Sequence, residues 1–439
     1  MNKTTLLAIL QQSEYDLPRW KKWAQEHATD TQEVAIEKWT AKLKLINLIS
    51  SGLFFLPSVT SISLAVSIIT PLENMVRWSI YTRASWKLWW YKLRGLKVVA
   101  IAGSYAKTST KNILFHAFSQ DNKALTTPNS INTMLGIAQV IREDLKAHHK
   151  VFIVEFGEYH PEDIPNLTQF VKPHFGILTP IGRQHLEVIG SFEKLIETFH
   201  SFVSYFKKDF SRLIVAEQNQ RYFSDLPLSY YGSQPATELR VFNAKVTRAG
   251  TEFEVLDKKT NHTYQSFTPL FGEHQAVNCL TAFWLAPRLQ QETIAISKRL
   301  RTTPYITRRH EPTFAENNVL VLDNSYNTNP DSVQESLKLL NQLEPSRRLL
   351  VTLGFTELGE ASDAIHFAFG QSLAKQVDYV GLIKAPWTQK IIDGFTLAGG
   401  KADHIKVGNS QEEAFAAIQE FVIAGSVVLF EGGYREVYV

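Results

Sequence analysis

The stretch KVVAIAGSYAKTSTK, residues 97 to 111, decides the fold of this chain. Residues 97 to 102 form a short apolar, β-branched run, which is typical of a buried parallel strand and breaks at Gly103 into a loop of small residues. A strand that ends in such a loop before a helix predicts a phosphate-binding site. Backbone N–H groups and the helix N-terminus attract phosphate oxygens, Lys107 can neutralise them, and the Thr108 hydroxyl can ligate Mg²⁺.

One residue of this loop departs from the usual pattern of a phosphate loop. Ala106 stands directly before the lysine, where glycine normally allows a tight turn close to the phosphate. If Ala106 adopts a positive φ, the strain costs about 1 to 2 kcal/mol, and its methyl group projects towards the ligand. The alternative hypothesis is an ordinary strand-to-helix turn in which Ser and Thr side chains cap the helix.

Length and composition limit the class of protein. A chain of 439 residues is too long for one ordinary core, so we expect two or three domains. An apolar content of 44% and a charged content of 20% are typical of a folded protein. The net charge of +3 does not favour nucleic acid, and we expect no nucleic-acid partner. The single cysteine, Cys279, excludes an intrachain disulfide and fits a reducing compartment.

An apolar stretch precedes the phosphate loop. Residues 45 to 72 carry no charged side chain, and this stretch is long enough to cross a bilayer once. Pro57 divides the stretch, so a tilted, kinked helix and a re-entrant hairpin are both possible. A buried helical hairpin of a soluble domain is the alternative. Residues 1 to 44 are predicted to be helical and amphipathic, without a signal peptide.

The segment from residue 73 to residue 97 supports membrane association. Six Lys and Arg residues face one acid, Glu73, among four tryptophans and two tyrosines. Basic residues mixed with amphipathic aromatic residues suit the cytoplasmic interface of a membrane. We therefore expect the chain at the cytoplasmic face of the cell membrane, with the membrane as a partner.

Strand and helix patterns alternate beyond the phosphate loop, as in a doubly wound α/β domain. Residues 151 to 155 and 175 to 179 are apolar runs that end in polar residues. Ligands of such sheets bind at the carboxyl ends of the strands, so Glu155 and residues 182 to 187 are placed where a nucleotide-bound metal would lie. A second series of strands and helices begins at Val319.

Seven segments between residues 97 and about 360 resemble, in order, the motifs of one family. They are GSYAKTSTK (103–111), TPNSINTMLGI (127–137), VEFGEYHPEDI (154–164), TPIGRQHLEVIGSFE (179–193), FGEHQAVNCLTA (271–282), LDNSYNTNPDSV (322–333) and LGFTELGE (353–360). Together they resemble the Mur ligases, most closely the branch that joins D-alanyl-D-alanine to a UDP-N-acetylmuramoyl tripeptide. The N-terminal part is similar to membrane-anchored members.

The resemblance implies an α/β fold in three parts. These are a helical N-terminal segment at residues 1–96, a central P-loop Mur ligase domain at 97–303 and a Rossmann-like C-terminal domain at 304–439. It also implies an ATP- and Mg²⁺-dependent ligase in which ATP phosphorylates a carboxylate and an amine attacks the acyl phosphate. The implied substrates are a UDP-muramoyl-peptide-like carboxylate and an amino acid or dipeptide.

The resemblance also assigns roles to individual residues. Lys107, Glu155 and His185 are the implied catalytic residues, and Thr108, Glu155 and His185 the implied metal ligands. The implied nucleotide-binding set is Gly103, Ser104, Tyr105, Ala106, Lys107, Thr108, Ser109, Asn278, Arg309, Asp323, Tyr326, Asn327 and Asn329.

Three positions depart from the family pattern in addition to Ala106. Active members carry a carbamylated lysine in a Lys-x-Glu pattern after the histidine segment, and Phe199 and Ser201 align with that lysine and glutamate. His200 could ligate a metal, but it lies about 100° around a helix from the required direction. Asn324 stands where the family usually has a second aspartate.

Three functional hypotheses follow. The first is an ATP-dependent amide ligase of cell-wall precursor synthesis. The second is a catalytically impaired relative that binds nucleotide and acts as a membrane-tethered scaffold or regulator, which Ala106, Phe199 and Ser201 favour. The third is a ligase that adds glutamate to a folate or another amino acid to a polymer.

Overall fold

The computed structural model describes residues 6–7, 41–52, 58–120, 123–184, 186–326 and 328–433. The chain divides into two compact units, and the first boundary along the sequence falls between Arg83 and Ala84. Most of the amphipathic helical segment predicted at residues 1 to 44 lies outside the described residues. The domain boundaries placed at residues 96 and 303 stay predictions, although the second falls between the last helix of one sheet domain and the first strand of the next.

Two helices form the described part of the N-terminal segment. Helix α3 covers Ala41–Gly52, and α4 covers Ser58–Leu93 with Pro71 inside it. At 1.5 Å per residue, α4 is about 54 Å long. One apolar cluster joins the two helices and includes Leu43 and Ile46 of α3 with Ile62 and Val66 of α4. The predicted apolar stretch therefore forms two packed helices on either side of residues 53–57, which lie outside the described part.

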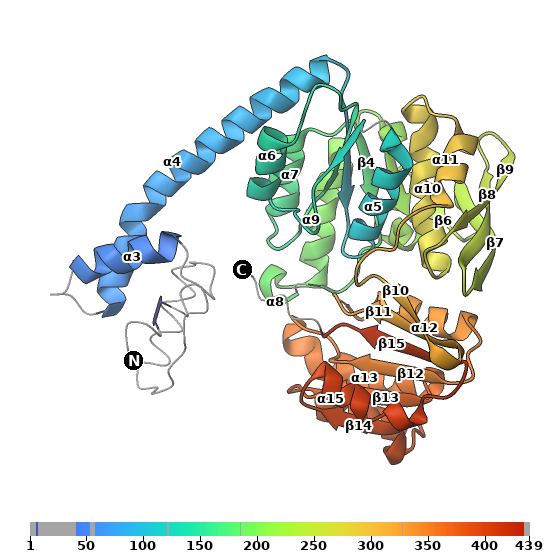
Figure 1. Cartoon of the computed structure of the whole chain (residues 1–439). Coiled ribbons are helices and arrows are strands. Elements are labelled where there is room, and N and C mark those ends of the chain that lie inside the picture. The colour runs from blue at the N-terminus through green and yellow to red at the C-terminus, as the bar shows by residue number, and fades with distance from the viewer. Residues whose placement is uncertain are drawn as a thin grey trace. The chain divides into compact units, whose positions relative to one another are not determined.

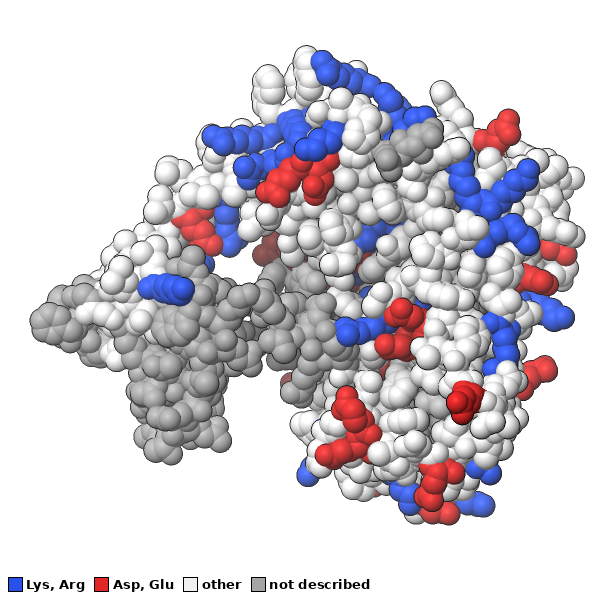
Figure 2. Space-filling model, in the orientation of Figure 1, with Lys and Arg blue, Asp and Glu red and all other residues white. Residues whose placement is uncertain are grey.

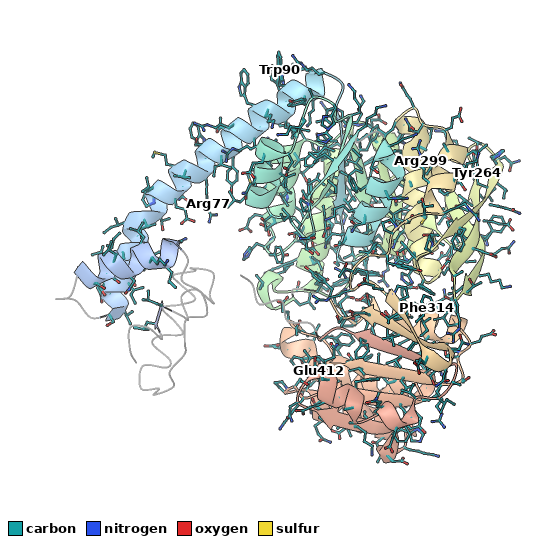
Figure 3. All side chains as sticks on the ribbon, in the orientation of Figure 1. Arg77, Trp90, Tyr264, Arg299, Phe314 and Glu412 are labelled. Carbon is teal, nitrogen blue, oxygen red and sulfur yellow. The ribbon has the colours of Figure 1, made fainter. Side chains whose placement is uncertain are left out.

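Helix α4 has the length and composition of a membrane-crossing helix, and among the described residues it alone does. One third of its most apolar part is buried within the chain. Its exposed apolar side chains run along the helix: Leu64, Ile68, Leu72, Met75, Val76, Trp78, Trp86, Trp89, Trp90 and Leu93. Figure 3 shows Trp90 projecting from the end of α4, and Figure 2 shows basic side chains gathered where α4 ends.

The central domain contains a nine-stranded sheet in the order β2-β3-β1-β4-β5-β6-β7-β8-β9. Its strands are β1 Lys97–Ala102, β2 Ala124–Thr126, β3 Val151–Glu155, β4 Phe175–Leu178, β5 Leu213–Ala216, β6 Ser229–Gly232, β7 Leu239–Thr247, β8 Gly250–Asp257 and β9 His262–Thr268. Strands β1, β3 and β4 confirm the predicted buried runs. The pairing is parallel as far as β7 and antiparallel in β7-β8-β9.

The prediction of a continuing strand and helix alternation is wrong over residues 229 to 268, where four strands follow one another without an α-helix. Strand β7 alternates buried and partly exposed residues, which is the pattern of an antiparallel strand with one solvated face. Strands β7, β8 and β9 are joined by short turns, which suit antiparallel neighbours.

Helices cover both faces of the central sheet (Figure 1). They are α5 Lys107–Phe118, α6 Met134–Glu143, α7 Asp163–Val171, α8 Leu186–Ile189, α9 Phe192–Tyr205, α10 Glu273–Arg288 and α11 Thr293–Leu300. Val99 and Ile101 of β1 pack with α5, α10 and α11 in one core cluster. Because side chains alternate along a strand, Val98 and Ala100 face the opposite layer, and all four are fully buried. Burial on both faces explains the unbroken apolar run of residues 98 to 102.

The C-terminal domain has its own six-stranded sheet, in the order β10-β11-β15-β12-β13-β14. Its strands are β10 Glu311–Ala315, β11 Val319–Asn324, β12 Arg348–Thr352, β13 Tyr379–Ile383, β14 Ile405–Gly408 and β15 Val427–Glu431. Its α-helices are α12 Val333–Gln342, α13 Ser362–Gln376, α14 Thr388–Leu397 and α15 Gln411–Ala416. Only β10 is antiparallel, so the second α/β domain predicted from Val319 onward is confirmed.

Gly103 is the glycine on which the loop after β1 depends. Its φ is 135°, and a Cβ there would lie 2.1 Å from Thr179 Oγ1 and 2.7 Å from the Thr179 carbonyl oxygen. We expect Gly103→Ala to lower the free energy of unfolding by about 2 to 3 kcal/mol, because both strain and overpacking contribute.

The matched control is Gly95→Ala, where φ is 94° and no atom lies within 4 Å of the added Cβ. This variant reports backbone strain alone, about 1 kcal/mol. Urea unfolding of both variants measures the difference. Equal losses of stability would contradict the close approach of Gly103 to Thr179.

Candidate nucleotide site

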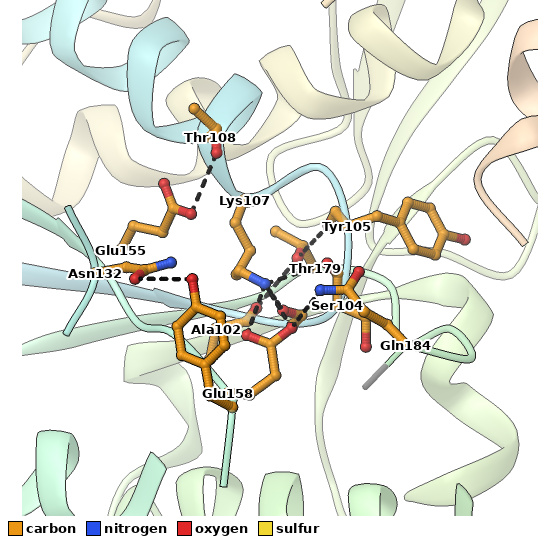
Figure 4. A network of polar contacts seen from close by, with 12 residues as sticks. Ala102, Ser104, Tyr105, Lys107, Thr108, Asn132, Glu155, Glu158, Thr179 and Gln184 are labelled. Atoms are coloured by element: carbon orange, nitrogen blue, oxygen red, sulfur yellow. Dashed lines mark hydrogen bonds and ion pairs between the residues drawn. The ribbon is translucent and has the colours of Figure 1, made fainter. Parts of the chain in front are cut away.

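The loop between β1 and α5 has the geometry of a phosphate loop. Four residues, Gly103 to Ala106, join the end of β1 to the first turn of α5. The Ser104 N–H donates to the Pro180 carbonyl at 3.0 Å, and Thr179 Oγ1 donates to the Tyr105 carbonyl at 2.7 Å (Figure 4). The loop is thereby fixed to the strand end of β4, directly before the N-terminus of α5, where a helix attracts anions.

Ala106 takes the left-handed conformation that the sequence analysis anticipated. Its φ is 64° and its ψ is −2°, and it occupies the N-cap position of α5 with no capping side-chain hydrogen bond. The alternative of a turn capped by Ser or Thr side chains is therefore wrong. A strained residue at this point is retained because the loop geometry requires it.

Lys107 makes a buried ion pair that the sequence analysis missed. Its Nζ lies 2.6 Å and 2.7 Å from the two carboxylate oxygens of Glu158, and it also donates to the carbonyls of Gly103 and Ser104. The side chains of Lys107 and Glu158 are 7% and 1% exposed. Glu158 follows Glu155 by three residues, on the loop after β3. A second glutamate so close to the predicted metal ligand was the feature of the sequence that could have indicated Glu158 as a site residue.

Thr108 and Glu155 lie together beside Lys107, as the phosphate-site hypothesis requires. Thr108 Oγ1 donates to Glu155 Oε1 at 3.2 Å, and Lys111 Nζ is 3.3 Å from Glu155 Oε2. Burial lowers the pKa of Lys111, the Glu155 carboxylate opposes this shift, and the Arg309 charge adds to it. A second buried lysine at the loop, also absent from the sequence predictions, thus adds positive charge to the site.

The residues present fit a nucleotide with Mg²⁺. A threonine hydroxyl and a carboxylate are oxygen ligands, which Mg²⁺ prefers, and Mg²⁺ usually takes one or two carboxylates together with substrate phosphates. Within the described residues no group of three or more His, Cys, Asp and Glu side chains could hold a metal by itself. Ser104 Oγ is buried and has no hydrogen-bond partner in that part of the chain, so it is free to meet a phosphate oxygen.

The histidine segment touches both domains next to the site. His185 and Asn327 lie outside the described residues, so their predicted roles stay predictions. Gln184, which precedes His185, donates to Glu158 Oε1 at 3.4 Å and accepts from Asn329 Nδ2 at 3.3 Å. The Arg183 N–H donates to Asp331 Oδ2 at 2.7 Å.

The other predicted residues of the C-terminal domain form local structure around this contact. The Arg309 guanidinium lies over the Tyr326 ring, 4.4 Å from its centre. Asp323 Oδ1 accepts from the Ser325 N–H, and Asn329 Oδ1 accepts from the N–H of the residues that precede α12. These side chains therefore shape the wall that faces the histidine segment.

Three predicted residues of the central domain lie apart from the Lys107 network. Tyr105 points away from Lys107 (Figure 4), and burial raises its pKa, with nearby acids of the C-terminal domain adding to the shift. Asn278 is buried in α10, and its amide donates to Gln275 at 3.1 Å. Ser109 is buried in the first turn of α5.

The Phe199 position supplies no metal ligand. The Phe199 side chain is fully buried in α9, and Ser201 Oγ donates to the Thr198 carbonyl of the same helix. The His200 ring packs against Phe223 at a centroid distance of 4.6 Å. The structure therefore gives no support to His200 as a replacement for the family lysine.

Asn324 is matched to a buried acid. Its Nδ2 donates to Glu431 Oε2 at 2.9 Å, and Thr328 Oγ1 donates to Glu431 Oε1 at 2.6 Å. Residues 324 and 431 face each other in the β11–β15 register. An aspartate at 324 would place two carboxylates in contact in a buried site, so the amide at 324 accompanies the carboxylate at 431.

Comparison with known proteins agrees with this geometry. The family model described as "Mur ligase middle domain" matches residues 101–286, and that described as "Mur ligase, glutamate ligase domain" matches residues 308–433. The chain belongs to the Mur ligase family. Its fold is accordingly the Mur ligase fold, with a central and a C-terminal α/β domain.

Individual relatives are distant. The UDP-N-acetylmuramoyl-tripeptide--D-alanyl-D-alanine ligases of Haemophilus influenzae and Escherichia coli are each 26% identical, over 63% of this chain and 61% and 62% of their own lengths. The chain thus spans about three fifths of these relatives. The MurF ligase of Thermotoga maritima, solved in complex with ADP, has a TM-score of 0.70 at 21% identity over 81% of this chain and 80% of that one.

Replacing Ala106 by glycine tests the strain at the phosphate loop. We expect Ala106→Gly to raise the free energy of unfolding by about 1 kcal/mol, because relief of the left-handed strain exceeds the added entropy of the unfolded chain. The control is Asn261→Gly at φ 52°, since asparagine tolerates this conformation. Urea unfolding measures both, and a less stable Ala106→Gly protein would contradict the account.

The burial of Glu431 predicts that the free energy of unfolding depends on pH. Burial raises its pKa from 4.5 to about 7, against the lowering effect of its hydrogen bonds. The folded state therefore binds more protons than the unfolded state between pH 4.5 and 7, and stability falls as the pH rises through this window. Above pH 7 the ionised Glu431 lowers the free energy of unfolding by about 3 kcal/mol.

We expect Glu431→Gln to match the wild type near pH 4.5 and to be more stable at pH 8, as measured by urea unfolding across this range. Glu420→Gln, at an exposed site, is the control and should leave the profile unchanged. Parallel profiles for Glu431→Gln and the wild type would show that Glu431 does not titrate in this way.

Proposed function

We propose that this chain is an ATP-dependent amide ligase that joins D-alanyl-D-alanine, or a similar amino compound, to the carboxylate of a UDP-muramoyl peptide. The observation that carries the proposal is the buried phosphate site, in which Lys107 pairs with Glu158 and Thr108 donates to Glu155. The names of the relatives support the choice of substrates. Membership of the Mur ligase family supports the reaction class.

The residues of this site match the needs of amide formation through an acyl phosphate. A carboxylate does not form an amide at neutral pH until one of its oxygens becomes a leaving group, and transfer of a phosphoryl group from ATP achieves this. Mg²⁺, held by Thr108 and Glu155, would neutralise phosphate charge when bound. Lys107 binds the terminal phosphates, and the backbone N–H groups at the start of α5 orient them, since those of Ser104 and Tyr105 already donate to the Pro180 carbonyl.

The C-terminal domain contributes from the opposite wall. The Arg309 guanidinium lies over the Tyr326 ring, 4.4 Å from its centre, and its positive charge acts on Lys111 of α5. The contact of Gln184 with Asn329 and that of Arg183 with Asp331 hold the histidine segment against this domain.

Phosphate release by the full-length chain tests the proposal. With ATP, Mg²⁺, a UDP-muramoyl tripeptide and D-alanyl-D-alanine, we expect release that requires both organic substrates. Lys107→Met should lower this rate by about a hundred-fold or more, because a charge contact to the transferred phosphoryl group is lost. Lys208→Met, at an exposed lysine, is the control.

A second candidate function, a nucleotide-binding homologue without catalysis, is favoured by the buried Phe199. Such a protein would act as a membrane-tethered scaffold or regulator. In the same assay it would bind ATP but release no phosphate, whereas substrate-dependent release would exclude it. Absence of both binding and release would contradict both functions.

We further propose that the chain works at the cytoplasmic face of the cell membrane, attached through α4. The apolar half of α4 exposes Ile68 and Leu72, which are 54% and 57% accessible. Its other half carries Trp78, Trp86, Trp89 and Trp90 among basic residues, a composition that suits the headgroup region.

Membrane fractionation of the full-length protein tests the attachment. We expect the double variant Ile68→Lys with Leu72→Lys to shift from the membrane fraction to the soluble fraction, because two charges would enter the apolar region. The matched control is Phe314→Lys with Leu397→Lys, two exposed apolar residues of the C-terminal domain. Equal sedimentation of both variants with membranes would contradict attachment through α4.

A further inference from the structure

Glu158 has no role in the reaction as described so far, although it lies at the centre of the site. Its side chain is 1% exposed, and both of its carboxylate oxygens contact Lys107 Nζ (Figure 4). We propose that Glu158 is a ligand of the nucleotide-bound Mg²⁺ and that its ion pair with Lys107 is the arrangement of the nucleotide-free protein. This inference rests on the proposed function.

Nucleotide binding must separate Glu158 from Lys107. A lysine ammonium has three N–H donors, and those of Lys107 are directed at the carbonyls of Gly103 and Ser104 and at Glu158. The two carbonyls belong to the loop itself, so Glu158 is the partner that a phosphate can displace. The carboxylate occupies the position at which Lys107 would meet a phosphate oxygen.

A displaced Glu158 would face the negative charge of the bound nucleotide. It would remain a buried carboxylate beside a polyphosphate, and two anions in a site of low dielectric repel each other strongly. The other buried lysine, Lys111, already pairs with Glu155 and donates to the Asn129 carbonyl. A divalent cation between the carboxylate and the phosphates removes the repulsion and gives Glu158 a partner of the type that Mg²⁺ sites use.

The surroundings of Glu158 point to the same metal. Thr108 and Glu155 lie on one side of Lys107, and Gln184, next to the predicted ligand His185, contacts Glu158 from the other side. Glu158 therefore lies between the two segments that are expected to hold the metal. Because it would contact the metal directly, it is a ligand and not a residue that merely orients one.

As a metal ligand, Glu158 would also compensate for the absence of the family lysine at position 199. A carbamylated lysine presents two anionic oxygens to a metal, and so does a glutamate. Phe199 cannot supply them because its side chain is apolar and buried in α9. Glu158 offers an equivalent pair of oxygens from the loop after β3.

Calorimetry of ADP binding to the full-length protein, with and without Mg²⁺, tests the inference without measuring catalysis. We expect Mg²⁺ to tighten ADP binding to the wild type. In Glu158→Gln, we expect ADP alone to bind more tightly than to the wild type, because the competing carboxylate is neutral. We also expect the tightening by Mg²⁺ to fall by about ten-fold, since one ligand is lost.

Two further variants complete the experiment. Glu162→Gln, an exposed acid close to Glu158 in sequence, should bind ADP like the wild type under both conditions. Glu158→Asp keeps a carboxylate and should retain more of the Mg²⁺ effect than Glu158→Gln. Thermal unfolding of each variant confirms that it is folded.

The outcomes separate the inference from the proposed function. If the wild type binds ADP and Glu158→Gln keeps the full tightening by Mg²⁺, the assignment of Glu158 is wrong while the ligase proposal stands. If the wild type binds no ADP with or without Mg²⁺, the ligase proposal fails, and the inference fails with it. Loss of the Mg²⁺ effect in Glu158→Gln alone supports the assignment.

Discussion

The parallel pairing of β1 with β3 on one side and with β4 on the other is the constraint on which the site depends. Ile101 lies opposite Glu155 in one register, and Ala102 lies opposite Leu178 in the other. The three strands therefore end at the same edge of the sheet, where their connections leave in different directions. The phosphate loop, the loop with Glu158 and the segment that begins at Thr179 converge there for this reason alone. Gly103 permits the close contact that joins the first of these segments to the third.

Charge at this edge is arranged in pairs of buried lysines and buried acids. Lys107 pairs with Glu158, and Lys111 pairs with Glu155. A buried ion pair adds little net stability, because desolvation offsets most of its attraction. Its value here is functional, since it brings lysines and acids together where an anion and a cation are expected to bind. In the C-terminal domain, the buried Glu431 pairs instead with the neutral amide of Asn324, and burial raises the pKa of Glu431 to about 7.

Much of the architecture could be predicted from the sequence because it rests on local patterns. The apolar runs at β1, β3 and β4 are buried on both faces of a sheet, and unbroken β-branched runs are the signal of such strands. The left-handed Ala106 followed from the loop pattern before Lys107. The three-stranded antiparallel extension was missed, because its half-exposed strands carry a weaker signal than the buried ones.

The charge partners could not be predicted from spacing. Glu158 and Lys111 are separated from their partners by 51 and 44 residues, and only the fold brings each pair together. Phe199 illustrates the opposite case, in which the departure was visible in the sequence but its consequence was not. Burial in α9 shows that the position has become part of the core, so restoring a lysine there would bury an unpaired charge.

A structure of the full-length chain with ADP and Mg²⁺ is the most direct test of the central claim, that this sheet edge binds nucleotide through Lys107. The account predicts a β-phosphate oxygen within hydrogen-bond distance of Lys107 Nζ, the metal beside Thr108 and Glu155, and the Lys107–Glu158 ion pair broken. ADP bound elsewhere, or bound while Lys107 still contacts Glu158, would contradict it.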